Sequence, residues 1–231
     1  MKTSQFLVLK LCLALLALAP SLGHADLCRG LFDKSPLVDT DRTQWKHIQK
    51  TFRASLDEES FQDLTWFSAK NNRPLARELN QKLLDKKLGS MSSRQLLVSQ
   101  TLTSLLSFNP VLLTPGSLLF VTADTFQVEG DFFTFKKGQR FLSQQFLFTH
   151  LNPQSAWHDK AQHTTAPVYF IIETEGVVPA IPSLDATMAG FILGQDVEFE
   201  VIEKSHNPIG PMPFHLGLPT LYVHLRARQA H

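Results

Sequence analysis

Two acidic residues near the end of the chain have a spacing that suits carboxylate chemistry. Glu198 and Glu200 are separated by Phe199, and alternate residues of a β-strand point to the same face. Two carboxylates in one cleft can accept a proton from a nucleophile and stabilise positive charge in a transition state. The same alternation also describes an ordinary half-buried strand whose acids lie in water. The spacing alone leaves both interpretations open.

Three histidines form a second group with ligand chemistry. His150, His158 and His163 lie close together in the sequence, with Asp159 nearby, and imidazole and carboxylate groups suit zinc. Five residues turn a helix by about 500°, so His158 and His163 do not share a helical face. A zinc hydrolase is one hypothesis. The simpler interpretation is a polar surface loop with exposed histidines, and we expect no metal.

Motifs of several other chemistries are missing from the sequence. The chain has no Gly-x-Ser-x-Gly nucleophile elbow. It also lacks a phosphate-cradling glycine-rich loop and a dinucleotide-binding fingerprint after a strand. These absences leave no sequence support for a serine hydrolase of that type or for a nucleotide-binding fold of either kind.

The first 25 residues have the pattern of a secretory signal peptide. Lys2 and Lys10 supply positive charge, an apolar run extends from Leu11 to Leu18, and Gly23-His24-Ala25 ends the segment with small residues. The apolar run is shorter than the roughly 20 residues that a membrane-spanning helix needs. We therefore expect cleavage after Ala25, and a protein that is secreted or periplasmic and has no membrane span.

The expected mature chain is long enough to be one domain with a helical preface. Removal of residues 1–25 leaves 231 − 25 = 206 residues, and the loss of Lys2 and Lys10 leaves 20 basic against 21 acidic residues. A net charge of −1 gives no electrostatic reason to expect nucleic acid or an anionic membrane as partner. Cys28 is the only cysteine left, so we expect no internal disulfide.

Helical patterns occupy the part of the mature chain before Pro110. Apolar residues recur there at helical spacing, including Trp45, Ile48 and Phe52 in one segment and Phe61, Leu64 and Phe67 in the next. Capping residues and prolines mark where helices begin. The expected helix starts are Asp41, the Ser55–Glu58 capping box, Pro74, and Ser92 or Ser93, and Gly89 is the expected end of the third helix.

Strand patterns occupy the part after Pro110. Short runs rich in Phe, Val and Ile are bounded by Gly, Pro, Asp or Asn. No long helical pattern separates these runs, which favours an α+β fold with N-terminal helices and a mostly antiparallel β core over a parallel sheet. The segment His206–Pro219 is a long connection that could cover a site. The expected strands are Ser117–Val121, Asp131–Phe135, Val168–Thr174, Val197–Ile202 and Leu221–Leu225.

Four segments, spread from about Phe61 to Leu225, share their order and pattern with a known family. They are Phe61–Phe67 with Pro74–Asn80, Leu102–Leu106 with Pro110–Leu112 and Leu118–Val121, Gly138–Phe141 with Phe146–Pro153, and Gly190–Val201. Their order resembles the ADP-ribosyltransferase family of bacterial toxins and effectors. The resemblance implies a core of two sheets with a cleft between them. It also implies transfer of ADP-ribose from NAD to a target protein.

The family's catalytic positions carry different residues in this chain. An Arg that holds the dinucleotide falls on Val121 or Thr122, and neither can bind a phosphate as a guanidinium does. The catalytic Glu falls on Gly190, which supplies neither charge nor a proton acceptor, and its partner two residues earlier falls on Met188. The Ser-Thr-Ser element falls on Phe148-Thr149-His150, where only the middle Thr is kept.

Thr149, Glu198 and Glu200 are therefore the candidate catalytic residues under this resemblance. Other branches of the superfamily use His and Tyr in place of Arg and Ser, but the spacing does not single out His150 or Tyr169 for that role. Cofactor-binding residues are not identified. The later strand of the family's closing signature, a Phe-x-Val strand, matches Phe199 and Val201, which places the two glutamates on an ordinary half-buried strand as the competing interpretation.

Two functions follow for the domain, whose expected limits are residues 58–231 after a helical preface at 26–57. The first is a secreted mono-ADP-ribosyltransferase with an atypical site, which uses NAD as substrate and modifies an unidentified protein. The second is a catalytically inactive relative, secreted or periplasmic, that binds a partner or ligand and needs no cofactor. The missing Arg and Glu favour the second function. Export favours the first.

Overall fold

The computed structural model describes residues 42–122, 126, 134–151, 156, 168–185, 189–207 and 220–230. The expected signal peptide, Cys28 and Met188 lie outside these residues, as do His158, His163 and His215. Most of the expected strand Asp131–Phe135 and of the connection His206–Pro219 also lies outside them.

Four α-helices precede the strands in the described part of the chain, and the change of character at Pro110 is confirmed. The helix α6 begins as expected: Ser92 caps it and forms a capping box with Gln95, in which each side chain bonds the other residue's backbone N–H. The helices are α3 (Arg42–Ala54), α4 (Glu58–Ser68), α5 (Arg73–Leu84) and α6 (Ser93–Phe108), with 3₁₀ turns η1 (Lys70–Asn72) and η2 (Leu88–Ser90).

Two expected helix ends are wrong. The N-cap of α4 is Asp57, whose carboxylate accepts the Ser60 N–H at 2.7 Å, whereas the Ser55 hydroxyl donates backwards to the carbonyl of Phe52. The bond from the Ser60 N–H to the Asp57 carboxylate also holds the pKa of Asp57 below its usual value. The helix α5 ends at Leu84, five residues before Gly89, and Lys86 adopts the left-handed conformation with φ 56°. The helix α5 therefore ends at a local cap, Asp85, and does not extend to Gly89.

The described strands form two sheets. In the four-stranded sheet the order is β1-β6-β7-β4, and all neighbours are antiparallel. In the five-stranded sheet the order is β2-β5-β9-β8-β3, and only β5 and β9 run parallel. The strands are β1 (Val111–Leu113), β2 (Leu118–Thr122), β3 (Arg140–Leu142), β4 (Leu147–Phe148), β5 (Val168–Thr174), β6 (Val178–Pro182), β7 (Phe191–Leu193), β8 (Val197–Asn207) and β9 (Thr220–Gln229).

The expected strands are confirmed where they were long and apolar. The strand β5 matches its expected bounds, β2 is shifted by one residue, and β8 and β9 extend beyond the expected segments. The α+β class with N-terminal helices and mostly antiparallel strands is also confirmed. The strands β1, β3, β4, β6 and β7 were not among the expected strands. β6 has five residues, as many as β2, and the other four have two or three.

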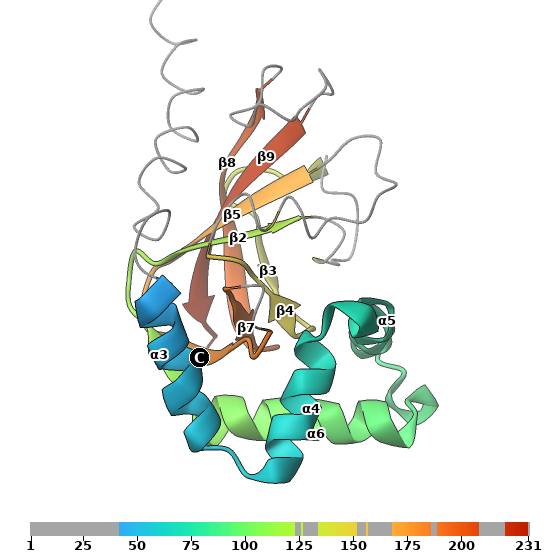
Figure 1. Ribbon diagram of the computed structural model, residues 1–231. Coiled ribbons are helices and arrows are strands. Elements are labelled where there is room, and N and C mark those ends of the chain that lie inside the picture. Colours follow the sequence, from blue (N-terminus) through green and yellow to red (C-terminus); the bar gives the residue numbers. More distant parts are fainter. Residues whose placement is uncertain are drawn as a thin grey trace, which may run out of the picture.

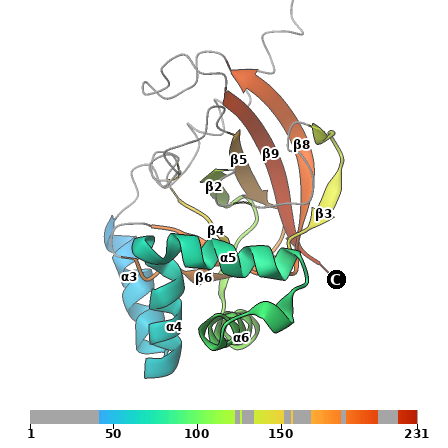
Figure 2. The same cartoon turned by 90° about the vertical axis from the view of Figure 1, so that its right-hand side faces the viewer.

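Three layers follow from the alternation of side chains. Helices and the five-stranded sheet lie at opposite ends of the molecule in both views (Figures 1 and 2). Between the two sheets, residues such as Leu119, Phe170, Leu193 and Phe199 form the main core. On the other face of the four-stranded sheet, residues such as Phe146 and Ile192 pack against the helices in a second core. Each fully buried side chain of this size contributes about 1.5–3 kcal/mol.

Candidate functional site

The two sheets are linked at one point, beside residues on which the resemblance places the family's motifs. Phe120 of β2 and His150 exchange two backbone hydrogen bonds of 2.8 Å, which link the sheets by an isolated bridge. Next to this bridge, the backbone N–H and the hydroxyl of Thr149 both donate to the carbonyl of Phe191, each at 2.8 Å. We call this region, made by Phe120–Thr122, Phe148–His150 and Gly190–Phe191, the sheet junction. Segments that are far apart in the sequence, from Phe120 to Phe191, thus lie side by side.

The sheet junction is closed and mostly apolar. Its side chains are nearly inaccessible to water: Val121 and Thr149 are 0% exposed, His150 1%, Phe148 3% and Thr122 4%. The Thr149 hydroxyl is occupied by the carbonyl of Phe191. The described side chains of the sheet junction are therefore packed away from solvent.

Gly190, at the position of the catalytic Glu, has no space for any side chain. A Cβ atom built on Gly190 would lie 1.9 Å from the carbonyl oxygen of Thr149 and 3.0 Å from its carbonyl carbon. Backbone bonds hold both sides of this contact, because Ser183 donates to the carbonyl of Gly190 and Leu151 donates to that of Ala189. Glycine is required here by close backbone approach, and a carboxylate at this position would displace the Thr149 strand.

Residues from the helices support the sheet junction. Asn80, in the segment that resembles the family's Asn-containing helix, bonds both the carbonyl and the N–H of Phe146 at 2.9 and 3.0 Å. Arg73, the first residue of α5, holds its guanidinium 3.9 Å from the ring centroid of Phe148, and that ring meets His150 edge-on. Sequence reasoning missed the contact of Arg73 because 75 residues separate it from Phe148.

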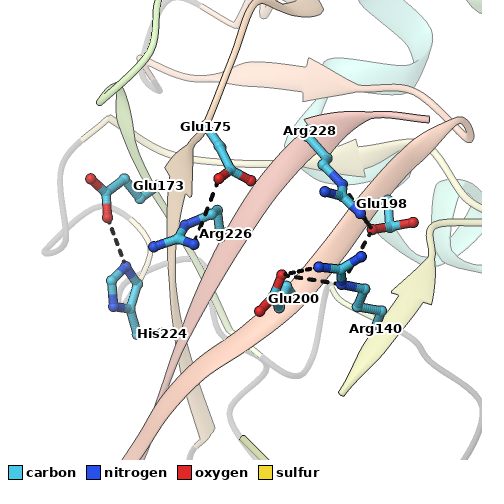
Figure 3. Close-up of polar contacts among 8 residues, drawn as sticks. All are labelled: Arg140, Glu173, Glu175, Glu198, Glu200, His224, Arg226 and Arg228. Carbon is cyan, nitrogen blue, oxygen red and sulfur yellow. Dashed lines mark hydrogen bonds and ion pairs between the residues drawn. The ribbon is translucent and has the colours of Figure 1, made fainter. Parts of the chain in front are cut away.

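Glu198 and Glu200 lie elsewhere, on the outer face of the five-stranded sheet (Figure 3). Their neighbours Val197, Phe199 and Val201 face the core between the sheets, so both carboxylates point away from it. The sheet therefore separates the two glutamates from the core side on which Thr149 bonds Phe191. The structure brings Glu198 and Glu200 together and does not bring either of them to Thr149.

Arginines of the neighbouring strands occupy both carboxylates. Arg228 of β9 bonds Glu198 through its Nε at 2.8 Å and through a terminal nitrogen. Arg140 of β3 approaches Glu200 at 3.1 Å and Glu198 at 3.9 Å. The side chains of Glu198 and Glu200 are 28% and 22% exposed. We call this arrangement of Arg140, Glu198, Glu200 and Arg228 the charge ladder. It places opposite charges on adjacent strands of a partly solvated sheet face.

The charge ladder continues on the same face to a buried histidine. His224 Nε2 lies 3.1 Å from a carboxylate oxygen of Glu173, and Arg226 lies 3.6 Å from Glu175. The His224 side chain is only 5% exposed. Burial lowers the pKa of His224 from its ordinary value, and the neighbouring Glu173 carboxylate opposes this shift without reversing it. The neutral imidazole is therefore the favoured form.

Solved structures with the same fold include ADP-ribosyltransferase toxins, although no family model and no curated protein matches the sequence. The ADP-ribosyltransferase Vis of Vibrio splendidus, in complex with agmatine, matches with a TM-score of 0.56 and 11% identity over 81% of this chain and 84% of Vis. The toxin Plx2a of Paenibacillus larvae matches at 0.53 and 14% over 80% and 92%. The Clostridium perfringens toxin BECa, solved with NADH, matches at 0.53 and 10% over 80% and 45%.

The chain has the fold of these ADP-ribosyltransferase toxins. Identities of 10–14% carry the fold alone, so activity must be argued from the site. Within this fold, the sheet junction and the charge ladder are two separate regions.

The described part of this toxin fold offers no metal centre and no membrane-spanning helix. No three His, Cys, Asp or Glu side chains converge there in a way that could hold a metal ion. His150, the one histidine of the zinc hypothesis that is described, is buried against Phe148, and its two partners lie outside the described residues. No described helix is long and apolar enough to cross a bilayer.

Two cavities open on the toxin fold away from the charge ladder. The larger, of about 340 Å³, lies between α3 and the strands β1 and β2. The smaller, of about 190 Å³, lies between α6 and the turn Gly194–Asp196. Neither of these two cavities is lined by Thr149, Gly190, Glu198 or Glu200.

Proposed function

We propose that this protein is an exported binding protein that keeps the ADP-ribosyltransferase fold without the transferase reaction. The contact between Gly190 and the carbonyl of Thr149 carries the proposal, because it removes the space for a carboxylate at the position where the family places its catalytic Glu. Close packing around Val121, Phe148 and His150 supports it, since a dinucleotide needs an open cleft with hydrogen-bond donors.

The reaction would need charge stabilisation that the sheet junction does not supply. Transfer of ADP-ribose develops positive charge on the ribose, and a nearby carboxylate offsets that charge. The described residues of the sheet junction include no Asp or Glu, and the guanidinium of Arg73 lies over the Phe148 ring. A cation beside the developing charge would oppose the reaction. The residues of the junction therefore stabilise the meeting of the two sheets.

A transferase with an atypical site is the second candidate, and the pairing of Glu198 with Glu200 on one face favours it. In that case NAD is the substrate, a protein is the target, and the two glutamates act from the outer sheet face with Arg140 and Arg228 as anion-binding partners. Thr149 takes no part from its place beyond the sheet. This candidate needs both carboxylates to leave their present ion pairs.

The deciding experiment incubates the purified mature protein with labelled NAD and cell lysate. We expect no labelled protein and no release of nicotinamide. Labelling that disappears in Glu200→Gln, but persists in Glu175→Gln on the same sheet face, would replace the binding proposal with the second candidate. Circular dichroism of both variants shows that any loss of labelling is not a loss of fold.

Export is tested independently of chemistry. The basic and apolar pattern of residues 1–25 supports a cleaved leader. Intact-mass measurement of protein recovered from the periplasm and the medium should give a chain that begins at Asp26. A full-length chain retained in the cytoplasm would remove export from the proposal and leave the question of NAD turnover unchanged.

A further inference from the structure

The cavity under α3 reaches from the surface into the core between the sheets. Helix α3 contributes Trp45 and Ile48 to its walls. Leu113 and Leu119, which belong to the main core, form its floor together with Leu151 and Phe191. Because these residues come from the helix and from both sheets, the cavity is a concave pocket with walls on several sides. Its volume is about 340 Å³.

The strand order explains why the core is open at this point. The strands β1 and β2 are edges of the two sheets in the described part of the chain, and only the short turn Thr114–Ser117 joins them. No described strand continues either sheet on this side. Helix α3 lies across the opening, where the Gln49 amide donates to the carbonyls of Ser183 and Asp185 at 2.6 and 3.2 Å. A packed helix thus covers the gap without filling it.

The α3 cavity touches the sheet junction at Phe191, and its other described lining residues lie outside the junction. Leu151 lines the cavity and belongs to the core between the sheets, whereas Phe148 and the adjacent His150 ring lie on the helix side, where Arg73 covers Phe148. Thr149, His150 and Gly190 are not among the residues that line the cavity.

The chemistry of the cavity walls selects the kind of ligand. None of the described lining residues is charged, and most are aliphatic or aromatic. Thr114 and Ser117 add hydroxyls. The Ser117 hydroxyl donates to the carbonyl of Thr114 at 2.7 Å and lies 3.5 Å from the Thr114 hydroxyl, and a hydroxyl oxygen has two lone pairs, so the Ser117 oxygen keeps room for one further donor. A cavity of about 150 Å³ binds benzene, and pockets for small ligands begin at about 300 Å³.

We propose that the α3 cavity binds a small, uncharged aromatic molecule of one or two rings that carries one N–H or O–H donor. The rings replace water against Trp45, Leu119 and Phe191, and the donor bonds the hydroxyl oxygen of Ser117. A charged group on the ligand is rejected because the walls offer no counter-ion. The inference goes beyond the proposed function, since NAD turnover and binding at this cavity are measured separately.

The test titrates 5-fluoroindole into the mature protein and follows the ¹⁹F NMR signal. We expect saturable binding, competition by unlabelled indole, and competition at least tenfold weaker by indole-3-carboxylate. Absence of saturable binding, or equal competition by the carboxylate, would overturn the proposal. A positive NAD assay would leave this result untouched.

Two helix variants locate the binding. Ile48→Trp places a larger side chain in the cavity wall and should abolish the titration, whereas Leu96→Trp makes the same kind of change on the exposed face of α6 and should leave it unchanged. Equal affinity in both variants would overturn the assignment to this cavity. If Ile48→Trp does not fold, Ser117→Ala replaces it, with at least threefold weaker binding of indole and unchanged binding of naphthalene expected. Unchanged binding of indole by Ser117→Ala would then overturn it.

Discussion

The sheet junction and the charge ladder both contain residues that the sequence suggested for catalysis. They differ in solvation, because the junction is buried and the ladder is partly exposed to water. In the junction, Thr149 and Gly190 meet through their backbones in a region that water does not reach. On the ladder, Glu198 and Glu200 stay partly solvated and are paired with arginines of the adjacent strands. The sheet junction thus holds the positions that the resemblance assigns to catalysis, but it has no carboxylate. The charge ladder has two carboxylates, but it lies on the outer face of the five-stranded sheet.

The difference follows from the cost of burying charge. A carboxylate in a closed junction would lose its hydration and find few donors, which costs several kcal/mol. On the outer face of a sheet, water and cross-strand arginines stabilise the same group at little cost. Val121, Phe148 and Thr149 are buried at the junction, so an unpaired acid costs much more there than on the solvated face of the sheet.

Gly190→Ala should give the largest effect, because the new Cβ would meet the carbonyl oxygen of Thr149 at 1.9 Å. We expect a loss of about 3 kcal/mol or more in the free energy of unfolding, measured by urea denaturation. Gly176→Ala is the matched control, since a Cβ there meets nothing within 4 Å. If the two variants were equally stable, the junction would have room for a side chain at position 190 and the comparison would fail.

Asn80→Ala should give the next largest effect on the junction. The side-chain amide satisfies both backbone groups of Phe146, and its removal leaves a buried donor and a buried acceptor without that partner. We expect destabilisation of about 2–3 kcal/mol in the same urea measurement. Gln81→Ala, one residue further along α5 on the exposed side, should cost well under half of that. Equal losses would mean that helix propensity explains the effect.

The sequence patterns predicted helices and strands better than they predicted the contacts between them. The strand β5 and the first half of β9 were predictable from apolar runs, and β8 from the alternation of apolar and acidic residues. The Ser92 cap was predictable because its partner Gln95 is three residues away. The strands β1 and β4 have three and two residues, too few for a periodic signal.

Only part of the candidate functional site could be predicted from the sequence. The sequence aligned Thr149 and Gly190 with a catalytic pair, but the closeness of their backbones depends on two strands that meet across 41 residues. The sequence also grouped Glu198 with Glu200 correctly, because strand alternation is local. Which face of the sheet they occupy depends on Phe199 and Val201 entering the core, and this was the competing interpretation from the start.

The charge ladder should respond to acid through His224. Its pKa is lowered in the folded protein, so the unfolded chain binds the proton more readily. Stability from the neutral imidazole is therefore fully present above the unfolded value of about 6.5 and is lost as the pH falls below it. We expect the free energy of unfolding to fall between pH 7 and pH 5 more steeply in the wild type than in His224→Gln. Parallel slopes would show that His224 titrates as an exposed residue.

Glu200→Gln should give the smallest effect on stability. The carboxylate shares Arg140 with Glu198, and the Arg140 side chain is 53% exposed, so water screens the pair. A change of about 0–1 kcal/mol is expected by urea denaturation, smaller again in 0.5 M salt. A loss as large as that of Asn80→Ala would mean that the ladder holds the sheet together as the junction does. The low free-energy cost of placing carboxylates on the solvated face would then not explain why they lie there. The contrast between the sheet junction and the charge ladder would need another cause.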